Sequence, residues 1–150
     1  MNAEPGAVPF AVAFDRQGHV VVAQAGTNAV ASYRLDRDDT LTRLSSVATG
    51  QAATCWIVAA GGEVYAANAG SGNLSGYATG AGGTLPSIGT FATGAGQVDV
   101  AAAPDGRYLY AQTGAAGGLV ALRIGAGGTL TKVGEVTVPG AAGGEGVVAL

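Results

Sequence analysis

The sequence predicts an all-β fold: a partial β-propeller of three four-stranded blades followed by one extra inner strand at the C-terminal end. Three observations predict it, namely a repeat of about 44 residues, four short β-prone runs in each repeat, and no 3.6-residue helical spacing. A propeller blade buries its faces only against neighbouring blades, which explains a fixed repeat better than a β-sandwich does.

Three markers recur once in each repeat. A turn glycine recurs every 44 residues, a Thr-Leu pair follows it, and a Thr-Gly or Pro-Gly pair closes the unit. The glycines are Gly26, Gly70 and Gly114; the Thr-Leu pairs begin at Thr40, Thr84 and Thr129; the closing pairs begin at Thr49, Thr93 and Pro139. These markers divide the single domain, 1–150, into blades of about 9–50, 51–94 and 95–140.

The first blade shows how the strands are recognised. Runs rich in Val, Ala, Phe and Tyr alternate with turn residues such as Asp15-Arg16-Gln17-Gly18. The strands expected here are Phe10 to Phe14, His19 to Gln24, Ala29 to Leu35 and Leu41 to Thr49. The corresponding first turn uses Gly61-Gly62 in the second blade and Pro104-Asp105-Gly106 in the third, because proline presets φ and glycine accepts a positive φ.

After the third blade, the segment 146–150 is predicted to be a fourth innermost strand, which would lack outer strands beside it. Two hypotheses follow. The favoured one is that the chain is the C-terminal part of a six- to eight-bladed protein whose N-terminal side is missing. The other is a homo-oligomer in which two copies complete a propeller ring.

Composition limits the classes of function. Hydrophobic residues make up 48% and charged residues 11%, which argues for a packed core. The net charge is −3 without a basic cluster, so no nucleic-acid partner is expected. Apolar stretches such as Val98 to Ala103 are too short to cross a membrane, and no signal peptide is visible. The default localisation is therefore cytoplasmic, although the expected truncation leaves the compartment of the parent protein open.

The single cysteine, Cys55, has no partner for a disulfide and no Cys or His at ligand spacing. The sequence therefore predicts no metal site and no cofactor. Cys55 is also a poor candidate nucleophile, because no histidine is placed to activate its thiol.

Several segments resemble bacterial seven-bladed lactonases, the family around 6-phosphogluconolactonase and carboxymuconate-cyclase-like proteins. The resemblance covers about Pro9 to Leu150 and is carried by the segments that begin at Pro9, Asn28, Thr49 and Asn68: PFAVAFD, NAVASYR, TGQAATCW and NAGSG. It implies a C-terminal portion of such a propeller. It also implies hydrolysis, or formation, of a lactone of a sugar acid or muconate-type acid, so a small lactone or sugar acid is the expected ligand.

Counting from the turn glycines places Ala11, Cys55 and Asp99 at one equivalent position on the innermost strands. Lactone opening needs a base that activates water, and the two candidate catalytic residues are Asp99 and Glu145. The candidate substrate-binding residues lie on the same loop face and are Gln51, Cys55, Asn68 and Gln97.

Simpler structural roles compete with these assignments. Asn68 is expected to cap backbone groups, Cys55 to be a small buried side chain, and Asp99 to serve structure as readily as chemistry. All seven cations are predicted to lie toward the opposite face, so groups that hold an oxyanion would have to come from missing blades, or a metal ion would have to bind, although the carboxylate spacing matches no recognised ligand motif. The alternative function is a noncatalytic propeller that binds or scaffolds a partner, or a fragment without independent activity.

Overall fold

The computed structural model of the chain describes residues 4–150. Twelve strands form three antiparallel four-stranded sheets, and each sheet keeps its strands in chain order. The first sheet contains β1 (Pro9–Phe14), β2 (Val20–Gln24), β3 (Ala29–Leu35) and β4 (Leu41–Ala48). The second contains β5 (Thr54–Ala60), β6 (Glu63–Asn68), β7 (Asn73–Ala78) and β8 (Ser87–Ala92). The third contains β9 (Gln97–Ala102), β10 (Tyr108–Thr113), β11 (Gly118–Ile124) and β12 (Leu130–Thr137).

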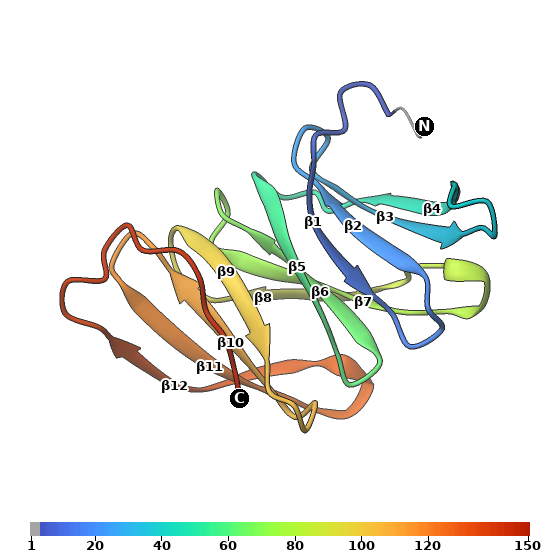
Figure 1. Ribbon diagram of the computed structural model, residues 1–150. Helices are drawn as coiled ribbons and strands as arrows, with labels where there is room; N and C mark the ends of the chain where they lie inside the picture. Colours follow the sequence, from blue (N-terminus) through green and yellow to red (C-terminus); the bar gives the residue numbers. More distant parts are fainter. Residues whose placement is uncertain (1–3) are drawn as a thin grey trace.

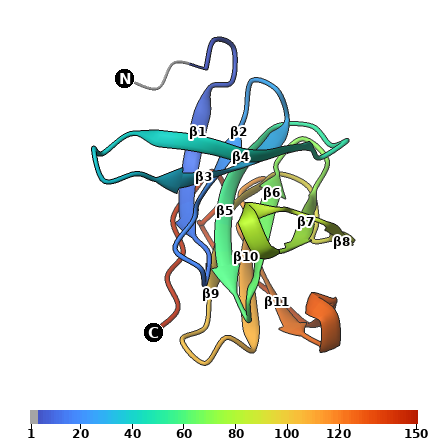
Figure 2. The ribbon, with the colours of Figure 1, turned by 90° about the vertical axis from the view of Figure 1, so that its right-hand side faces the viewer.

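The three sheets stand side by side like propeller blades, as Figures 1 and 2 show. The first strands of the blades, β1, β5 and β9, pack against one another, and β4, β8 and β12 lie at the outer edges. Short 3₁₀ turns, η1 (Ala81–Gly83) and η2 (Ala126–Gly128), precede the outermost strands of the second and third blades. The fold is the partial β-propeller that the repeat predicts.

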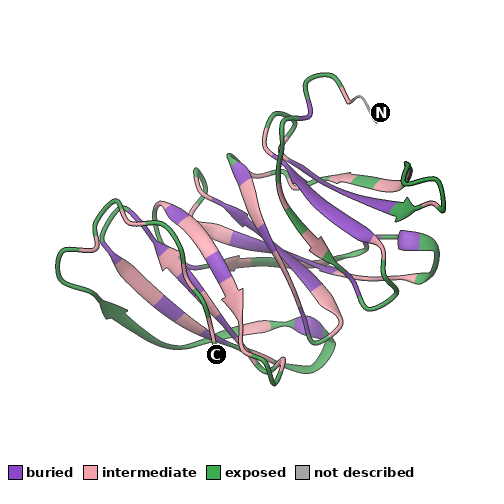
Figure 3. Cartoon of the chain, in the orientation of Figure 1, coloured by how far each residue is buried: buried purple, intermediate pink, exposed green. Residues whose placement is uncertain are grey.

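The core lies between blades rather than within one. Val21, Ala23 and Val30 of the first blade pack against Val64 and Tyr77 of the second. The other face of the second blade packs against the third through a cluster of fully buried residues that includes Tyr65, Leu74, Leu109, Ala111 and Leu122. Figure 3 shows that the buried residues are concentrated on the two middle strands of each blade. Each fully buried Leu contributes roughly 1.5–3 kcal/mol of transfer free energy.

Two glycines are required because neighbouring blades approach each other closely at their positions. Gly83 and Gly128 both have a φ of +75°. A Cβ at Gly83 would meet Leu44 of the first blade, and one at Gly128 would meet Glu63 and Ile88 of the second. The carbonyl oxygens of these two glycines accept hydrogen bonds from Ser32 and from Tyr65. Glycine is therefore needed for both the backbone conformation and the space.

The repeat extends further toward the N-terminus than the sequence markers suggest. Gly6 lies 44 residues before Gly50, and both have a positive φ, +79° and +67°. The backbone N–H groups of Ala25 and Gly26 donate to Val8 and Ala7 as those of Ala69 and Gly70 donate to Ala53 and Ala52. Residues 4–8 therefore correspond to the connectors that lead into the second and third blades.

Within residues 4–150, no blade packs against one face of the first blade. Val20, Val22, Ala31 and Tyr33 form a separate apolar cluster there, with Leu41 packed beside it. Val12, the ladder partner of Val22, lies on the same face and is 56% exposed. We call this surface, formed by Val12 and the cluster, the open face.

The structure assigns no strand to residues 146–150, where the sequence predicts an inner strand. The segment runs beside β9 (Figure 1), but the hydrogen bond of the Val147 N–H goes to the Asp99 carboxylate and not to a strand backbone. A strand requires backbone hydrogen bonds to a neighbouring strand, and none of the described strands pairs with residues 146–150. No helix among the described residues is long and apolar enough to span a membrane.

Candidate functional site

Asp99 lies on β9 and anchors the C-terminal segment. Its Oδ2 atom accepts a hydrogen bond of 2.8 Å from the Val147 N–H, and its Oδ1 atom accepts one of 2.7 Å from the Val100 N–H. Both carboxylate oxygens are thus engaged by backbone donors. This geometry gives Asp99 a structural role. The sequence predicted either a structural or a catalytic role for this residue.

Glu145 lies in the anchored segment, two residues before Val147, and its side chain is exposed. Within residues 4–150, its carboxylate makes no side-chain hydrogen bond or ion pair. Strand β9, which carries Asp99, packs against β5, which carries Cys55, and the hydrogen bond from Val147 to Asp99 ties the segment of Glu145 to β9. Burial, followed by the charges of Glu145 and Asp99, raises the pKa of the Cys55 thiol. Two predicted catalytic residues and one predicted binding residue therefore lie on, or are tied to, the inner strands β5 and β9.

The strand ladders correct the predicted equivalence of Cys55 and Asp99. Ile57 pairs with Ala66 as Val12 pairs with Val22 and Val100 with Ala111. Val12, Ile57 and Val100 are therefore equivalent positions on the inner strands. The residues that precede them, Ala11, Trp56 and Asp99, are equivalent as well. The span from Ile57 to Ala66 is one residue shorter than the span from Val12 to Val22, so counting back from Gly70 misplaces Cys55 by one position. The connector from Gly50 to β5, which is one residue longer than those after Gly6 and Gly94, compensates and keeps the repeat at 44. Trp56 packs edge-on against Phe10, with ring centroids 5.4 Å apart.

Gln51 and Asn68 belong to a continuous network of hydrogen bonds at the top of the second blade. Asn68 is fully buried; its Nδ2 atom donates to Asn73 Oδ1 and to Ser75, at 2.8 and 2.9 Å. Asn73 Nδ2 in turn donates to Gln51 Oε1 at 2.8 Å, and Thr54 Oγ1 donates to Asn68 Oδ1 at 2.7 Å. The Asn68 amide and the Gln51 Oε1 atom are used in internal hydrogen bonds, so these two predicted binding residues help to hold the blade together.

Gln97, the remaining predicted binding residue, is fully buried at the start of β9. Its Oε1 atom accepts a hydrogen bond of 2.7 Å from Thr93 Oγ1. Its Nε2 atom is buried and has no hydrogen-bond partner among the described residues. A buried donor without a partner costs free energy, which makes Gln97 the least satisfied of the predicted site residues.

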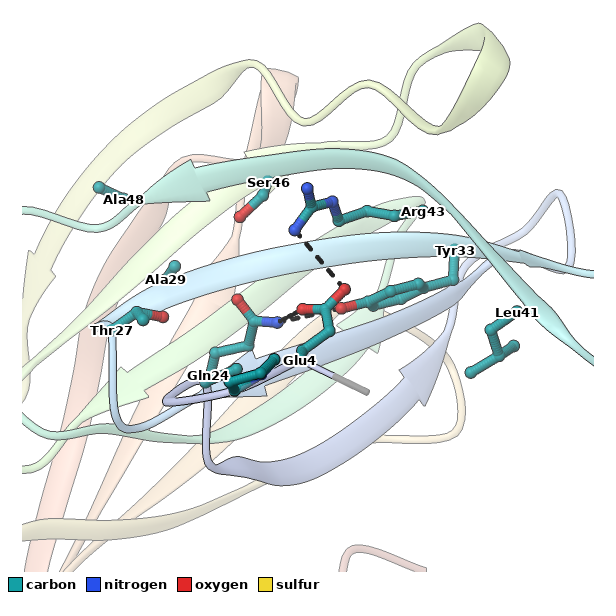
Figure 4. Close-up of a pocket in the computed structure, with 11 residues that line it drawn as sticks. Glu4, Gln24, Thr27, Ala29, Tyr33, Leu41, Arg43, Ser46 and Ala48 are labelled. Carbon is teal, nitrogen blue, oxygen red and sulfur yellow. Dashed lines mark hydrogen bonds and ion pairs between the residues drawn. The ribbon is translucent and has the colours of Figure 1, made fainter. Parts of the chain in front are cut away.

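A second candidate site, which sequence reasoning missed, lies at the upper edge of the open face (Figure 4). Gln24 Nε2 donates to Glu4 Oε2 at 2.7 Å and to the Tyr33 hydroxyl at 3.0 Å. Arg43 Nη1 lies 3.6 Å from Glu4 Oε1. These four side chains line a pocket of about 620 Å³. Burial, followed by the hydrogen bond to Glu4, raises the pKa of Tyr33 to about 12.

Arg43 is an exception to the prediction that every cation lies toward the opposite end of the blades. Its side chain reaches the cluster that contains Gln24, a residue at the loop end of β2. The missed signal is the pair Pro5-Gly6, which repeats Pro139-Gly140 and lies 44 residues before Thr49-Gly50. Recognising that pair as a connector would have placed Glu4 over the first blade.

At the opposite end of the inner strands, the first turns of the three blades surround another pocket, of about 630 Å³. Asp15 is buried there and accepts hydrogen bonds from the Gln17 and His19 N–H groups, and His19 Nδ1 lies 2.8 Å from Asp15 Oδ2. The Arg16 side chain lies over Gly62 so closely that a Cβ at that glycine would collide with it. These contacts fix the turn and account for His19 as a structural residue.

Metal binding finds no support in the side chains that the structure describes. Residues 4–150 contain no group of three or more His, Cys, Asp or Glu side chains that could hold an ion.

No protein-family profile matches the sequence, and no curated protein matches it. Solved structures match the fold. A candidate 6-phosphogluconolactonase from Bacteroides uniformis superposes with a TM-score of 0.78 and 20% identity, covering 91% of this chain and 45% of that one. The periplasmic gluconolactonase of Pseudomonas aeruginosa gives a TM-score of 0.80 and 17% identity, with coverage of 92% and 42%.

The chain has the β-propeller fold. It spans less than half the length of both lactonase-named proteins. A streptogramin B lyase matches more distantly, with a TM-score of 0.65, 15% identity and coverage of 92% of this chain and 43% of that one. The same fold thus occurs in proteins named for different reactions, so the fold alone does not fix an activity.

Proposed function

We propose that this propeller chain contributes to a lactonase-type site, with Glu145 as the general base and Asp99 as a positioning residue. The observation that carries the proposal is the hydrogen bond of 2.8 Å that ties the segment of Glu145 to Asp99 on β9, the inner strand that packs against β5 and its Cys55. The fold shared with two lactonase-named proteins supports the choice of substrate class, a lactone of a sugar acid.

The chemistry assigns different tasks to the two carboxylates. An exposed carboxylate without an internal partner can accept a proton from water, so Glu145 activates the water that attacks the lactone carbonyl carbon. The ring C–O bond then breaks, and the leaving oxygen takes up a proton to give the hydroxy acid. Asp99 holds the backbone of Val147 at 2.8 Å and thereby fixes where Glu145 lies. Groups that stabilise the oxyanion would come from outside this set.

The test is a hydrolysis assay on glucono-1,5-lactone and its 6-phosphate, corrected for spontaneous opening, with the solution mass measured on the same sample. General-base catalysis is worth about 10²- to 10⁴-fold, so Glu145→Gln should remove most of the rate above background. Glu135→Gln is the matched control, because Glu135 is exposed and paired with Lys132 on an outermost strand.

Asp99→Ala distinguishes positioning from chemistry. Loss of the anchor should raise KM and lower kcat by less than Glu145→Gln does, and the pH profile of the remaining activity should keep its shape. A wild-type rate equal to the spontaneous rate, or equal rates for Glu145→Gln and Glu135→Gln, overturns the proposal.

A further inference from the structure

The carboxylate of Glu4 is held by donors from three different strands of the first blade. Gln24 Nε2 on β2 donates to Glu4 Oε2 at 2.7 Å, and Arg43 Nη1 on β4 lies 3.6 Å from Oε1. The Tyr33 hydroxyl on β3 hydrogen-bonds to the same carboxylate. Figure 4 shows the Glu4 side chain between these groups. An amide N–H, a hydroxyl and a guanidinium around one carboxylate are the donor set of a carboxylate-binding site.

Two of these donors are built into the blade. Gln24 is 4% exposed and Tyr33 is 5% exposed, and both lie on the two middle strands of the sheet. Gln24 Nε2 also donates to the Tyr33 hydroxyl at 3.0 Å, which fixes the two groups relative to each other. Because both side chains are packed in place, the donors keep their geometry when the carboxylate between them is exchanged.

Glu4, in contrast, is attached loosely. Backbone hydrogen bonds from β2 and the turn that follows it anchor the connector at residues 7 and 8, beyond Gly6. Gly6 has a φ of +79° and open space where a Cβ would lie. Apart from its side chain, Glu4 is held by one turn hydrogen bond, from the Ala7 N–H. Its side chain is 25% exposed, so the carboxylate can leave for water without disturbing the anchor.

The pocket is much larger than one carboxylate. Its volume of about 620 Å³ lies within the range of roughly 300–1,000 Å³ that is typical of small-molecule sites. Its walls include Thr27 and Ser46, whose hydroxyls make no side-chain hydrogen bond within residues 4–150. Arg43 is 58% exposed, so its guanidinium can turn toward a molecule in the pocket.

The second blade does without this donor set. Asn68 takes the place of Gln24 at the end of the second strand, and its amide donates to two side chains of its own blade. Ser87 takes the place of Arg43 on the fourth strand. A blade therefore folds without a cation or an exchangeable carboxylate here, so the cluster in the first blade is not a requirement of the fold.

We propose that this pocket binds a small monocarboxylate anion, and that Glu4 occupies the carboxylate position until the ligand displaces it. The ligand carboxylate accepts hydrogen bonds from Gln24 Nε2 and the Tyr33 hydroxyl, and it pairs with the Arg43 guanidinium. A neutral amide of the same shape fits less well, because its NH₂ group would face donors and it carries no charge for the guanidinium. The inference does not rest on the proposed lactonase activity.

The experiment is a titration of the ¹⁵N-labelled chain with propionate at neutral pH and constant ionic strength. It is followed by the resonances of the Gln24 side-chain NH₂ group and the Arg43 Nε–H group. Saturating shifts of both are expected at millimolar concentrations. Propionamide, which has nearly the same shape and no charge, should give shifts at least about ten times weaker at equal concentration, because hydrogen bonds to charged groups are the stronger ones.

Glu4→Ala removes the internal competitor. A ligand that binds only the open pocket has its affinity reduced by the fraction of chains in which the pocket is open. The variant should therefore bind propionate at least about tenfold more tightly, whereas loss of a merely structural carboxylate would not strengthen binding. Glu135→Ala is the matched control, because it removes the same charge from an exposed side chain on the third blade and should leave the affinity unchanged.

Arg43→Gln, introduced into the Glu4→Ala chain, should weaken propionate binding at least about tenfold. Arg34→Gln is its control, because Arg34 is also 58% exposed but is paired with Asp36. Absence of saturating shifts in both the wild-type and Glu4→Ala chains, or equal responses to propionate and propionamide, overturns the proposal. Equal affinities of the Glu4→Ala and Glu135→Ala chains, or equal effects of the two arginine substitutions, overturn it as well.

Discussion

The carboxylate of Asp99 accepts a hydrogen bond of 2.8 Å from the backbone N–H of Val147, 48 residues away in the chain. A strand segment would have paired with a neighbouring backbone, whereas here the side chains of Asp99 and Gln112 bond to the C-terminal segment, with Gln112 Nε2 donating to the Gly144 carbonyl oxygen at 3.0 Å. The Asp99 contact links the third blade to the segment that carries Glu145, so its strength can be tested separately from any activity.

Asp99→Ala should release the C-terminal segment without unfolding the blades. A hydrogen bond to a charged group is worth about 1.5–3 kcal/mol, and about 1.4 kcal/mol corresponds to a tenfold change in an equilibrium. The Val147 N–H should therefore exchange with solvent at least about tenfold faster, as measured by hydrogen–deuterium exchange, while the N–H groups of β10 keep their protection. Unchanged exchange at Val147 would show that Asp99 does not hold the segment.

Cys55 should react slowly with alkylating agents near neutral pH. Its pKa is raised above the ordinary value of 9.0 by burial and by the charges of Glu145 and Asp99, and the thiolate is the reactive form. The rate of iodoacetamide modification should therefore rise only above pH 9. Glu145→Gln should shift this profile to lower pH, whereas Glu135→Gln should not. Identical profiles for the two variants would contradict the proximity of Glu145 and Cys55.

Asn68→Ala should destabilise the protein strongly. The substitution removes a fully buried amide and leaves Thr54, Asn73 and Ser75 without their partner. Buried groups left unsatisfied cost about 1–3 kcal/mol each, so the free energy of unfolding in urea should fall by at least about 2 kcal/mol. Thr129→Ala, which removes only the exposed hydrogen bond to Ala126, serves as the control and should change stability by less than about 0.5 kcal/mol.

Stability should fall at alkaline pH. The pKa of Tyr33 is raised from 10.0 to about 12, and burial also raises the pKa values of Tyr65 and Tyr77. A raised folded-state pKa means that the stabilisation is complete below pH 10 and is lost as pH rises through the folded-state value. Urea midpoints should therefore decline between pH 10 and 12. Tyr33→Phe should reduce this decline, and an undiminished decline would contradict the assignment to Tyr33.

The open face should drive self-association, in keeping with the prediction of a homo-oligomer. Val12 is 56% exposed beside the apolar cluster of Val22 and Tyr33. Contiguous apolar patches of this kind mark interaction surfaces, so Val12→Ser should lower the mass-average molar mass measured by light scattering at high protein concentration. Val133→Ser is the control, because Val133 is 52% exposed on the outermost strand of the third blade. Equal effects of the two substitutions would argue against a specific role of the open face.

The sequence by itself determined the architecture, because the turn glycines, the Thr-Leu pairs and the four β-prone runs are local features that recur with each blade. Gly26, Gly70 and Gly114 located the turns, and the four strands of the first blade begin and end within about one residue of the predicted ranges. Turn and strand preferences depend on residues that are close in the sequence, so they can be recognised without knowing the tertiary contacts.

Only the tertiary structure decided what the polar residues do. A one-residue difference in connector length moved Trp56 into the place predicted for Cys55. No local signal reveals that Asn73 bonds to both Asn68 and Gln51. Hydrogen bonds between side chains depend on which strands become neighbours and in what register, and a slip of one residue turns a side chain to the other face. That dependence is why Gln97, predicted only as one binding residue among several, is singled out by its unpaired donor.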